Sequence, residues 1–358
     1  MNRYAFSLAA LSLGLALAFP PAPACAGPDQ QTASKTAAAG KTAERRADLR
    51  TQNWYLPCHA GPSMVNVSLI PGRVLKSADD AWNGQTVLWE GRIIKHYKNI
   101  NGRNELLLGT EAGSILVKYA NPARNLEYDR TGCRVAVKGA LRIKNSRLQY
   151  LAGTSCILLE PPKDYGFQRW LNGRSPSAQE FLEWRLLFHN PESDMQKIKA
   201  AAKSLLRNCA AHNVEPALMA SLIQIESAWD SDAVSPSGAC GLGQLMPRTA
   251  EGLGVDDPMD PAQNLDGAVT MTGRLVRAWE NGCNPYASVL ASYNAGPTIV
   301  KSLGGRVPPY AETTNYVYFI GFVRRDMLKQ AHRLHVPGLE YPLPKVHSFP
   351  VQQAAKAE

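Results

Sequence analysis

Glu226 stands in a stripe of otherwise apolar residues that has helical spacing. Met219, Leu222 and Ile223 precede it at intervals that place all four side chains on one face of a helix. In the ordinary interpretation, the carboxylate lies at the edge of this face and reaches solvent. In the alternative, apolar surroundings raise the pKa of the carboxyl group, which then stays protonated near neutral pH and can serve as a general acid.

A glycine-rich segment follows, and its side chains suit the binding of a sugar. The sequence SPSGACGLGQLMPRTAEGLG, which begins at Ser235, holds five glycines. Each alone indicates a turn, but together they let the backbone approach a ligand closely. Gln244 offers both a donor and an acceptor to hydroxyl and acetamido groups, and Met246 offers an adaptable apolar surface. Pro247 occupies a favoured position for the first turn of a helix.

Two later segments contribute polar and aromatic side chains. ASVLASYNAGP predicts a helix that begins near Pro285, ends at a Gly-Pro pair and carries Tyr293 and Asn294 in its last turn. YAETTNYVYFIGFV predicts the start of another helix, with Glu312 and Tyr316. Tyrosines on helices most often belong to the core or its rim, so neither segment indicates a site by itself.

Taken in order, these segments resemble the soluble lytic transglycosylase family. The four matching motifs are ES at 226–227, SGAxGLxQLMP from Ser237 to Pro247, SYNAG at 292–296 and ETxxYV from Glu312 to Val317. The resemblance covers residues 196–330 and implies a goose-type-lysozyme-like domain. Gly243 stands where the family often has Met, and we expect this departure to loosen the floor of the cleft.

The resemblance implies that Glu226 is a single catalytic acid. It would protonate the glycosidic oxygen between N-acetylmuramic acid and N-acetylglucosamine in peptidoglycan. It would then act as a base while the muramic acid C6 hydroxyl attacks C1, which gives a 1,6-anhydromuramoyl end. Asp230 and Asp232 are expected to be solvated or to cap the helix end. The positions that match the family's cleft are Ser235, Gln244, Met246, Tyr293, Asn294 and Tyr316.

Two other functions remain open at this point. A muramidase would hydrolyse the same bond and leave no anhydro sugar. A non-catalytic envelope-binding protein would depend on the N-terminal part of the chain instead. The combination of Glu226 with all four motifs favours the lytic transglycosylase. No cofactor is expected, and no Cys/His spacing indicates a metal site.

The segment before these motifs predicts a small β-barrel. Five short stretches rich in β-branched residues are separated by Asn and Gly turns: TVLWEGRIIKHY, NELLLGT, SILVKYA, CRVAVKGALRI and RLQYLAGTSCILLE. Their order loosely resembles an OB-fold. A two-residue hairpin at Lys144-Asn145 would set Cys133 opposite Cys156, which is the disulfide pair that we expect. The alternative is a pair of buried thiols.

The beginning of the chain is typical of a secretory signal peptide. Arg3 precedes an apolar stretch, and small residues follow up to Ala26. A lipoprotein signal would use Cys25 instead, but Ala22 and Pro23 fit such a signal poorly, so we expect soluble export to the periplasm.

These elements predict a multidomain α+β chain in which an OB-like barrel precedes an all-α lysozyme-like catalytic domain. The expected parts are a signal peptide at 1–26, a flexible tether at 27–52, an OB-like β-barrel accessory domain at 53–160, a linker with a helix at 161–193, the catalytic domain at 194–335 and a Pro-rich tail at 336–358.

The distribution of charge along the chain indicates what kind of partner the barrel binds. The chain carries a formal net charge of +9. Residues 82–160 hold twelve Lys/Arg against six Asp/Glu, whereas residues 194–335 hold thirteen of each. We therefore expect an exported basic barrel to meet peptidoglycan or another anionic envelope polymer, or a protein partner, but no nucleic acid. Cleavage after residue 26 would leave six cysteines, which suits an oxidising compartment.

Overall fold

The structure is a computed structural model of the 358-residue chain. It describes residues 65–98, 104–119, 131–160, 171–189, 193–282 and 284–339. The expected signal peptide and tether, and residues 340–358 of the expected tail, lie outside the described residues. Over the described ranges, every helix is too short or too polar to span a membrane.

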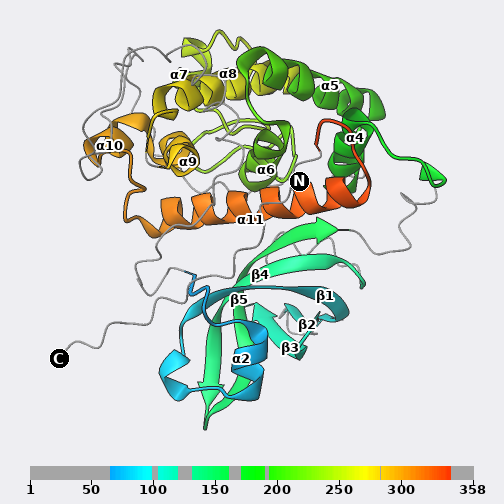
Figure 1. The fold of residues 1–358 in the computed structure, drawn as a ribbon, viewed down its shortest axis with the longest axis vertical. Helices are drawn as coiled ribbons and strands as arrows, with labels where there is room; N and C mark the ends of the chain where they lie inside the picture. Colours follow the sequence, from blue (N-terminus) through cyan, green and yellow to red (C-terminus); the bar gives the residue numbers. More distant parts are fainter. Residues whose placement is uncertain are drawn as a thin grey trace, which may run out of the picture.

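Five strands close into a barrel in the order β1-β2-β3-β5-β4 (Figure 1). They are β1 (Thr86–Lys98), β2 (Asn104–Thr110), β3 (Gly113–Tyr119), β4 (Arg134–Lys144) and β5 (Arg147–Glu160). All neighbouring pairs are antiparallel except β3 and β5, which run parallel. The five strands expected from the sequence, and their closure into a barrel, are thereby confirmed.

Apolar side chains at alternate positions along the strands fill the inside of this barrel. In β3, for example, Ile115, Val117 and Tyr119 are buried, while the residues between them are partly exposed. Helix α2 (Pro71–Lys76) and the short 3₁₀ helix η1 (Asp80–Trp82) precede the barrel. The indole Nε1 of buried Trp89 donates to the backbone oxygen of Leu69 at 2.7 Å, so this preceding segment is fastened to β1.

The expected disulfide between Cys133 and Cys156 is wrong, because both residues are reduced thiols. The hairpin turn lies at Asn145 and Ser146, one position later than expected, and both residues have φ of 53°. Three irregularities then shift the register between β4 and β5, so Cys156 pairs with Val137 and not with Cys133. Alternation along the two strands could not reveal these irregularities.

The rest of the described chain is helical. After α4 (Ala178–His189), the helices are α5 (Met195–His212), α6 (Pro216–Ser227), α7 (Pro247–Gly252), α8 (Pro261–Trp279), α9 (Pro285–Ala295), α10 (Pro297–Ser302) and α11 (Ala311–Arg333). Proline begins α6, α7, α8, α9 and α10, as its fixed φ and missing N–H favour. The helices expected at Pro247 and Pro285 are confirmed.

Helix α6 lies inside the helical core and therefore shows burial on more than one face. Ten of its residues are buried, among them Met219, Leu222 and Ile223, which are fully buried. The helix ends at Ser227; its C-cap residue Ala228 has φ of 51°, and Trp229 follows with φ of 67°. Two successive residues in the left-handed region turn the chain sharply just after Glu226.

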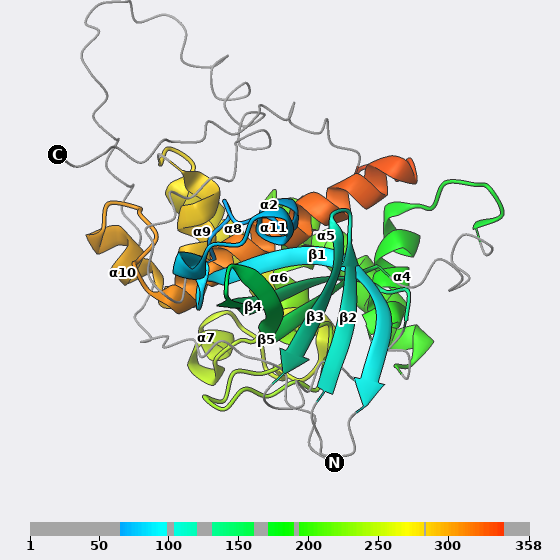
Figure 2. The same cartoon turned by 90° about the horizontal axis from the view of Figure 1, so that it is seen from below.

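Helix α4 and helix α11 join the barrel to the helical core. Phe181 and Leu182 of α4 belong to the helical core, whereas Phe188 of the same helix packs in the barrel core. In Figure 1, α11 runs between the other helices and the barrel, and in Figure 2 the barrel strands lie over it. The segment expected to be a linker thus contains a helix, α4, that packs against both the helical core and the barrel.

Candidate active site

Glu226 and Tyr316 meet where α6 ends and α11 begins. The Tyr316 hydroxyl donates to Glu226 Oε1 at 2.5 Å. The exposed fraction is 7% for Glu226 and 1% for Tyr316, so the carboxyl group does not reach solvent as a residue at the edge of the stripe would. The pair comes from positions that are 90 residues apart in the chain.

The surroundings of Glu226 favour its protonated form. Burial, which penalises the ionised form, raises the pKa of the carboxyl group from 4.5 to about 8. The hydrogen bond from Tyr316 favours the carboxylate and acts in the opposite direction, while the negative charge of Glu312 raises the pKa further. At neutral pH the group therefore holds its proton, as a general acid must.

Tyr293 ties α9 to the glycine-rich loop beside this carboxyl group. It is 6% exposed, and its hydroxyl donates to the Gly243 carbonyl oxygen at 2.8 Å. Burial first, and then the charge of Glu226, raise the pKa of Tyr293 well above its usual value. A Cβ at Gly243 would lie 2.6 Å from the Ala268 Cβ and 3.1 Å from the Tyr293 hydroxyl. Neighbouring side chains therefore fill the space that a side chain at position 243 would need.

Gln244 and Ser235 organise the same loop. The Gln244 amide nitrogen donates to the carbonyl oxygens of Ala233 at 3.1 Å and Gly241 at 2.8 Å. Its Oε1 atom is buried and has no hydrogen-bond partner among the described residues. The Ser235 hydroxyl accepts from the Ala239 amide at 2.8 Å, which makes its contact local to the loop.

Asn294 and Met246 complete the expected set. Asn294 is buried, and its Oδ1 accepts from the Thr313 hydroxyl at 2.7 Å, which joins the ends of α9 and α11. Met246 is partly buried and precedes the first residue of α7. The structure therefore brings Glu226, Tyr293 and Tyr316 together directly, and it links Gln244 and Asn294 to them through the loop and α11.

Glu312 was part of a sequence motif, but the sequence did not assign it a function. It lies in the first turn of α11, and its Oε1 atom is buried with no hydrogen-bond partner among the described residues. Burial raises its pKa, which a hydrogen bond with Asn294 partly opposes. Its charge acts on Glu226, as described above. Only the placement of α11 against α6 reveals this proximity.

The other nearby acids behave as the sequence suggested. Asp232 is exposed, and its backbone N–H donates to Asp230 Oδ1 at 3.0 Å, which is a local turn contact.

A cavity of about 270 Å³ lies elsewhere, beside the α5–α6 connection, and Cys209, Glu215 and Tyr286 are among its lining residues. None of the candidate site residues lines it. Within the described ranges, no group of three or more His, Cys, Asp or Glu side chains could hold a metal ion.

Comparison with known proteins identifies the segment that carries this site. Residues 205–313 match the profile of the family described as Transglycosylase SLT domain. The resemblance predicted from the four motifs is thereby confirmed.

Relatives with curated names agree with this match. The chain is 29% identical over 197 residues to "Membrane-bound lytic murein transglycosylase F 2" of Alkalilimnicola ehrlichii, which covers 48% of this chain and 44% of that protein. It is 44% identical over 62 residues to the "Transglycosylase" of Enterobacteria phage PRD1, which covers 17% of this chain and 23% of that protein. The chain thus spans less than half the length of these relatives.

Among solved structures, the 70 kDa soluble lytic transglycosylase SLT70 of Escherichia coli is similar at 20% identity and a TM-score of 0.35. The match covers 49% of this chain and 34% of that one. A complex of the 70 kDa soluble lytic transglycosylase with bulgecin A matches at 21% identity and a TM-score of 0.34, and the match covers 48% of this chain and 34% of that one.

We expect the substitution Tyr316→Phe to raise the pKa of Glu226 further. The change removes the donor that stabilises the ionised carboxylate and leaves the burial in place. The measurement is an NMR titration of the Glu226 carboxyl carbon. Tyr318→Phe makes the same chemical change two residues further along α11 and serves as the control, with an unchanged pKa. A pKa of Glu226 that stays constant or falls in Tyr316→Phe would contradict this description of the site.

Proposed function

We propose that this protein is a peptidoglycan lytic transglycosylase. It cleaves the β-1,4 bond between N-acetylmuramic acid and N-acetylglucosamine and forms a 1,6-anhydromuramoyl product. The observation that carries this proposal is the buried carboxyl group of Glu226, which is protonated at neutral pH and held by Tyr316. The SLT segment at residues 205–313 and the names of the relatives support the same class of reaction.

Glu226 acts first as an acid and then as a base. It donates its proton to the glycosidic oxygen, and the bond between C1 of the muramic acid and that oxygen breaks. The acetamido group of the same sugar stabilises the positive charge at C1. The Glu226 carboxylate then removes the proton from the C6 hydroxyl, and O6 bonds to C1. The proton that leaves Glu226 is thus replaced, and no water is consumed.

Other residues hold the acid and the sugar in this scheme. The hydrogen bond from Tyr316 stabilises the Glu226 carboxylate in the interval between the two proton transfers. The unpartnered Gln244 oxygen can accept from a sugar hydroxyl or an acetamido N–H. The remaining positions proposed to line the cleft are Ser235, Met246, Tyr293 and Asn294.

The muramidase alternative requires a water molecule and, in most glycosidases, a second carboxylate across the scissile bond. Asp230 does not suit this task, because it contacts the turn that follows α6. Glu312 comes from the same side of the carboxyl group as Tyr316, in the first turn of α11, and its charge raises the pKa of Glu226. These features favour the mechanism with a single acid.

We propose that the protein works in the cell envelope after export, as a soluble periplasmic enzyme. The pattern of residues 1–26 supports soluble export, and the name of the murein transglycosylase of Alkalilimnicola ehrlichii supports the envelope location only.

We further propose that the barrel is OB-like and binds an anionic envelope polymer, with peptidoglycan stem carboxylates as its ligands. Part of its basic excess serves other contacts, since Arg134 pairs with Asp326 and Glu160. Arg142, Lys144 and Arg147 remain exposed at the β4–β5 hairpin. Lys144 and Arg147 lie directly opposite each other, an arrangement of like charges that disfavours the hairpin unless an anion lies between them.

We expect Glu226→Gln to lose at least about a hundredfold in turnover of peptidoglycan, because the amide keeps the shape but cannot donate the proton. The variant should also melt at a higher temperature than the wild type at alkaline pH. The folded pKa of about 8 exceeds the ordinary 4.5, so ionisation opposes folding as pH rises between these values, and Gln removes this effect.

The measurements are the release of soluble muropeptides from purified sacculi and thermal unfolding followed by circular dichroism. Asp230→Asn and Asp232→Asn are the controls, and both should keep nearly full turnover. Substantial turnover by folded Glu226→Gln would remove this residue from the proposed role. A loss of turnover at either aspartate equal to that at Glu226 would favour a hydrolase with two carboxylates.

We expect the triple variant Arg142→Gln, Lys144→Gln and Arg147→Gln to bind sacculi more weakly than the wild type at low salt. The difference should shrink at high salt, which screens such attractions. The control replaces Lys197, Lys199 and Lys203 of α5, which are exposed, with Gln and so removes the same charge from another surface. Co-sedimentation with sacculi is the measurement, and equal losses of binding in the two triple variants would contradict a specific surface on the barrel.

A further inference from the structure

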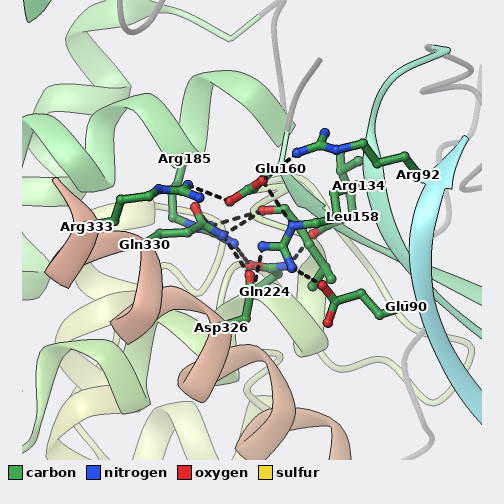
Figure 3. A network of polar contacts seen from close by, with 11 residues as sticks. Glu90, Arg92, Arg134, Leu158, Glu160, Arg185, Gln224, Asp326, Gln330 and Arg333 are labelled. Atoms are coloured by element: carbon green, nitrogen blue, oxygen red, sulfur yellow. Dashed lines mark hydrogen bonds and ion pairs between the residues drawn. The ribbon is translucent and has the colours of Figure 1, made fainter. Parts of the chain in front are cut away.

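A buried polar network connects the end of β5 to two helices of the active site. Figure 3 shows its side chains converging from the barrel, α4, α6 and α11. Glu160, the last residue of β5, accepts from Arg92, Arg134 and Arg333. Arg134 also pairs with Asp326 of α11 at 2.5 Å. Glu160 and Asp326 are 7% and 6% exposed and Arg134 is largely buried, whereas Arg92 and Arg333 reach the carboxylate of Glu160 from the surface.

Two glutamines hold consecutive carbonyl oxygens of β5. The amide nitrogen of Gln224 in α6 donates to the Leu158 oxygen at 2.8 Å. The amide nitrogen of Gln330 in α11 donates to the Leu159 oxygen at 3.2 Å. The exposed fraction is 5% for Gln224 and 2% for Gln330, so neither carbonyl can exchange its partner for water without opening the interface.

Arg185 of α4 joins the two glutamines from the other side. Its Nη2 donates to the Gln224 oxygen at 2.5 Å, and its Nη1 donates to the Gln330 oxygen at 3.2 Å. Arg185 is 2% exposed and also donates to the Leu159 oxygen at 3.3 Å. Each glutamine is therefore held at both ends of its amide, by a guanidinium group and by a β5 carbonyl.

The two glutamines differ in their distance along the chain from the reacting groups. Gln224 lies two residues before Glu226 on α6, whereas Gln330 lies fourteen residues after Tyr316 on α11. A shift of α6 along its axis would carry Glu226 away from Tyr316, and the amide of Gln224 resists that shift. The start of α6 is tied to α11 instead, because Arg324 donates to both carboxylate oxygens of Glu215, the N-cap residue. Gln224 ties the other end of the helix, where Glu226 lies, to β5.

We propose that Gln224 is a positioning residue, which fixes α6 to the barrel strand β5 and so sets Glu226 against Tyr316. The inference deepens the proposed function and rests on it. In this arrangement the barrel is a fixed part of the catalytic unit as well as a binding module. Removing the barrel would expose Arg185 and leave the Gln224 amide without its acceptor, so the SLT segment alone would hold its acid less accurately.

The test compares Gln224→Met with Gln330→Met in the full-length protein. Methionine keeps the length of each side chain and removes its hydrogen bonds to Arg185 and to a β5 carbonyl oxygen. Gln330→Met also removes a hydrogen bond to Asp326 at 2.6 Å, so the control variant loses more of the network than Gln224→Met does. With soluble muropeptide oligomers as substrate, we expect Gln224→Met to lose on the order of a hundredfold in kcat with KM nearly unchanged. Gln330→Met should keep kcat within about threefold of the wild type, because it displaces the reacting atoms less.

A second readout does not depend on activity. The pKa of Glu226, measured by NMR titration of its carboxyl carbon, should fall towards its ordinary value in Gln224→Met, because a displaced carboxyl group becomes better hydrated. It should stay unchanged in Gln330→Met. If the wild type releases no muropeptides, the proposed function fails, while this titration still decides whether Gln224 positions the acid.

Gln224→Asn replaces Gln224→Met if the latter does not fold. It keeps the amide but is one methylene shorter, so it cannot reach both Arg185 and the Leu158 oxygen. The same loss of kcat and the same shift of the Glu226 pKa are expected, both smaller in size. Equal loss of kcat in folded variants of Gln224 and Gln330, or an unchanged Glu226 pKa in the Gln224 variant, would overturn the proposal and leave the network with a structural role only.

Discussion

The burial of one ionisable carboxyl group constrains the whole molecule. Raising the pKa of Glu226 from 4.5 to about 8 means that ionisation in the folded state is disfavoured by on the order of 5 kcal/mol. This is a large fraction of the stability of a typical domain. The surrounding structure has to offset the part of this cost that falls between the ordinary pKa and the working pH. It also has to keep the group accurately placed, since the Tyr316 hydroxyl must reach it when the proton leaves.

The fold meets this requirement by enclosing α6 on several sides. Fully buried aliphatic side chains of α6 pack in the helical core, and the left-handed residues Ala228 and Trp229 end the helix just beyond Glu226. Helix α11 brings Tyr316 and Glu312 to the carboxyl group at its beginning and meets the barrel further along. The barrel, whose presence the active-site motifs did not require, closes the remaining side through β5. Helices α6 and α11 therefore both carry active-site residues and contact the barrel.

Local patterns predicted much of this from the sequence. The strands, the helix starts at proline and the SLT segment follow from alternation, from the fixed φ of proline and from four ordered motifs, all properties of neighbouring residues. The Cys133–Cys156 pairing failed because β-bulges change the register without changing alternation. The proximity of Glu312 to Glu226 and the Arg185 contacts with Gln224 and Gln330 were missed because they depend on the tertiary arrangement of α4, α6, α11 and β5. A buried arginine in a presumed linker carried no signal in the sequence.

The central claim is that a single buried acid breaks the glycosidic bond without water, and the identity of the product tests it most directly. Mass spectrometry of the muropeptides released from purified sacculi by the mature protein measures the end that forms. The account predicts 1,6-anhydromuramoyl ends, each lighter by one water than the hydrolysed sugar. Reducing N-acetylmuramic acid ends, formed with uptake of oxygen from labelled water, would contradict it and identify a muramidase.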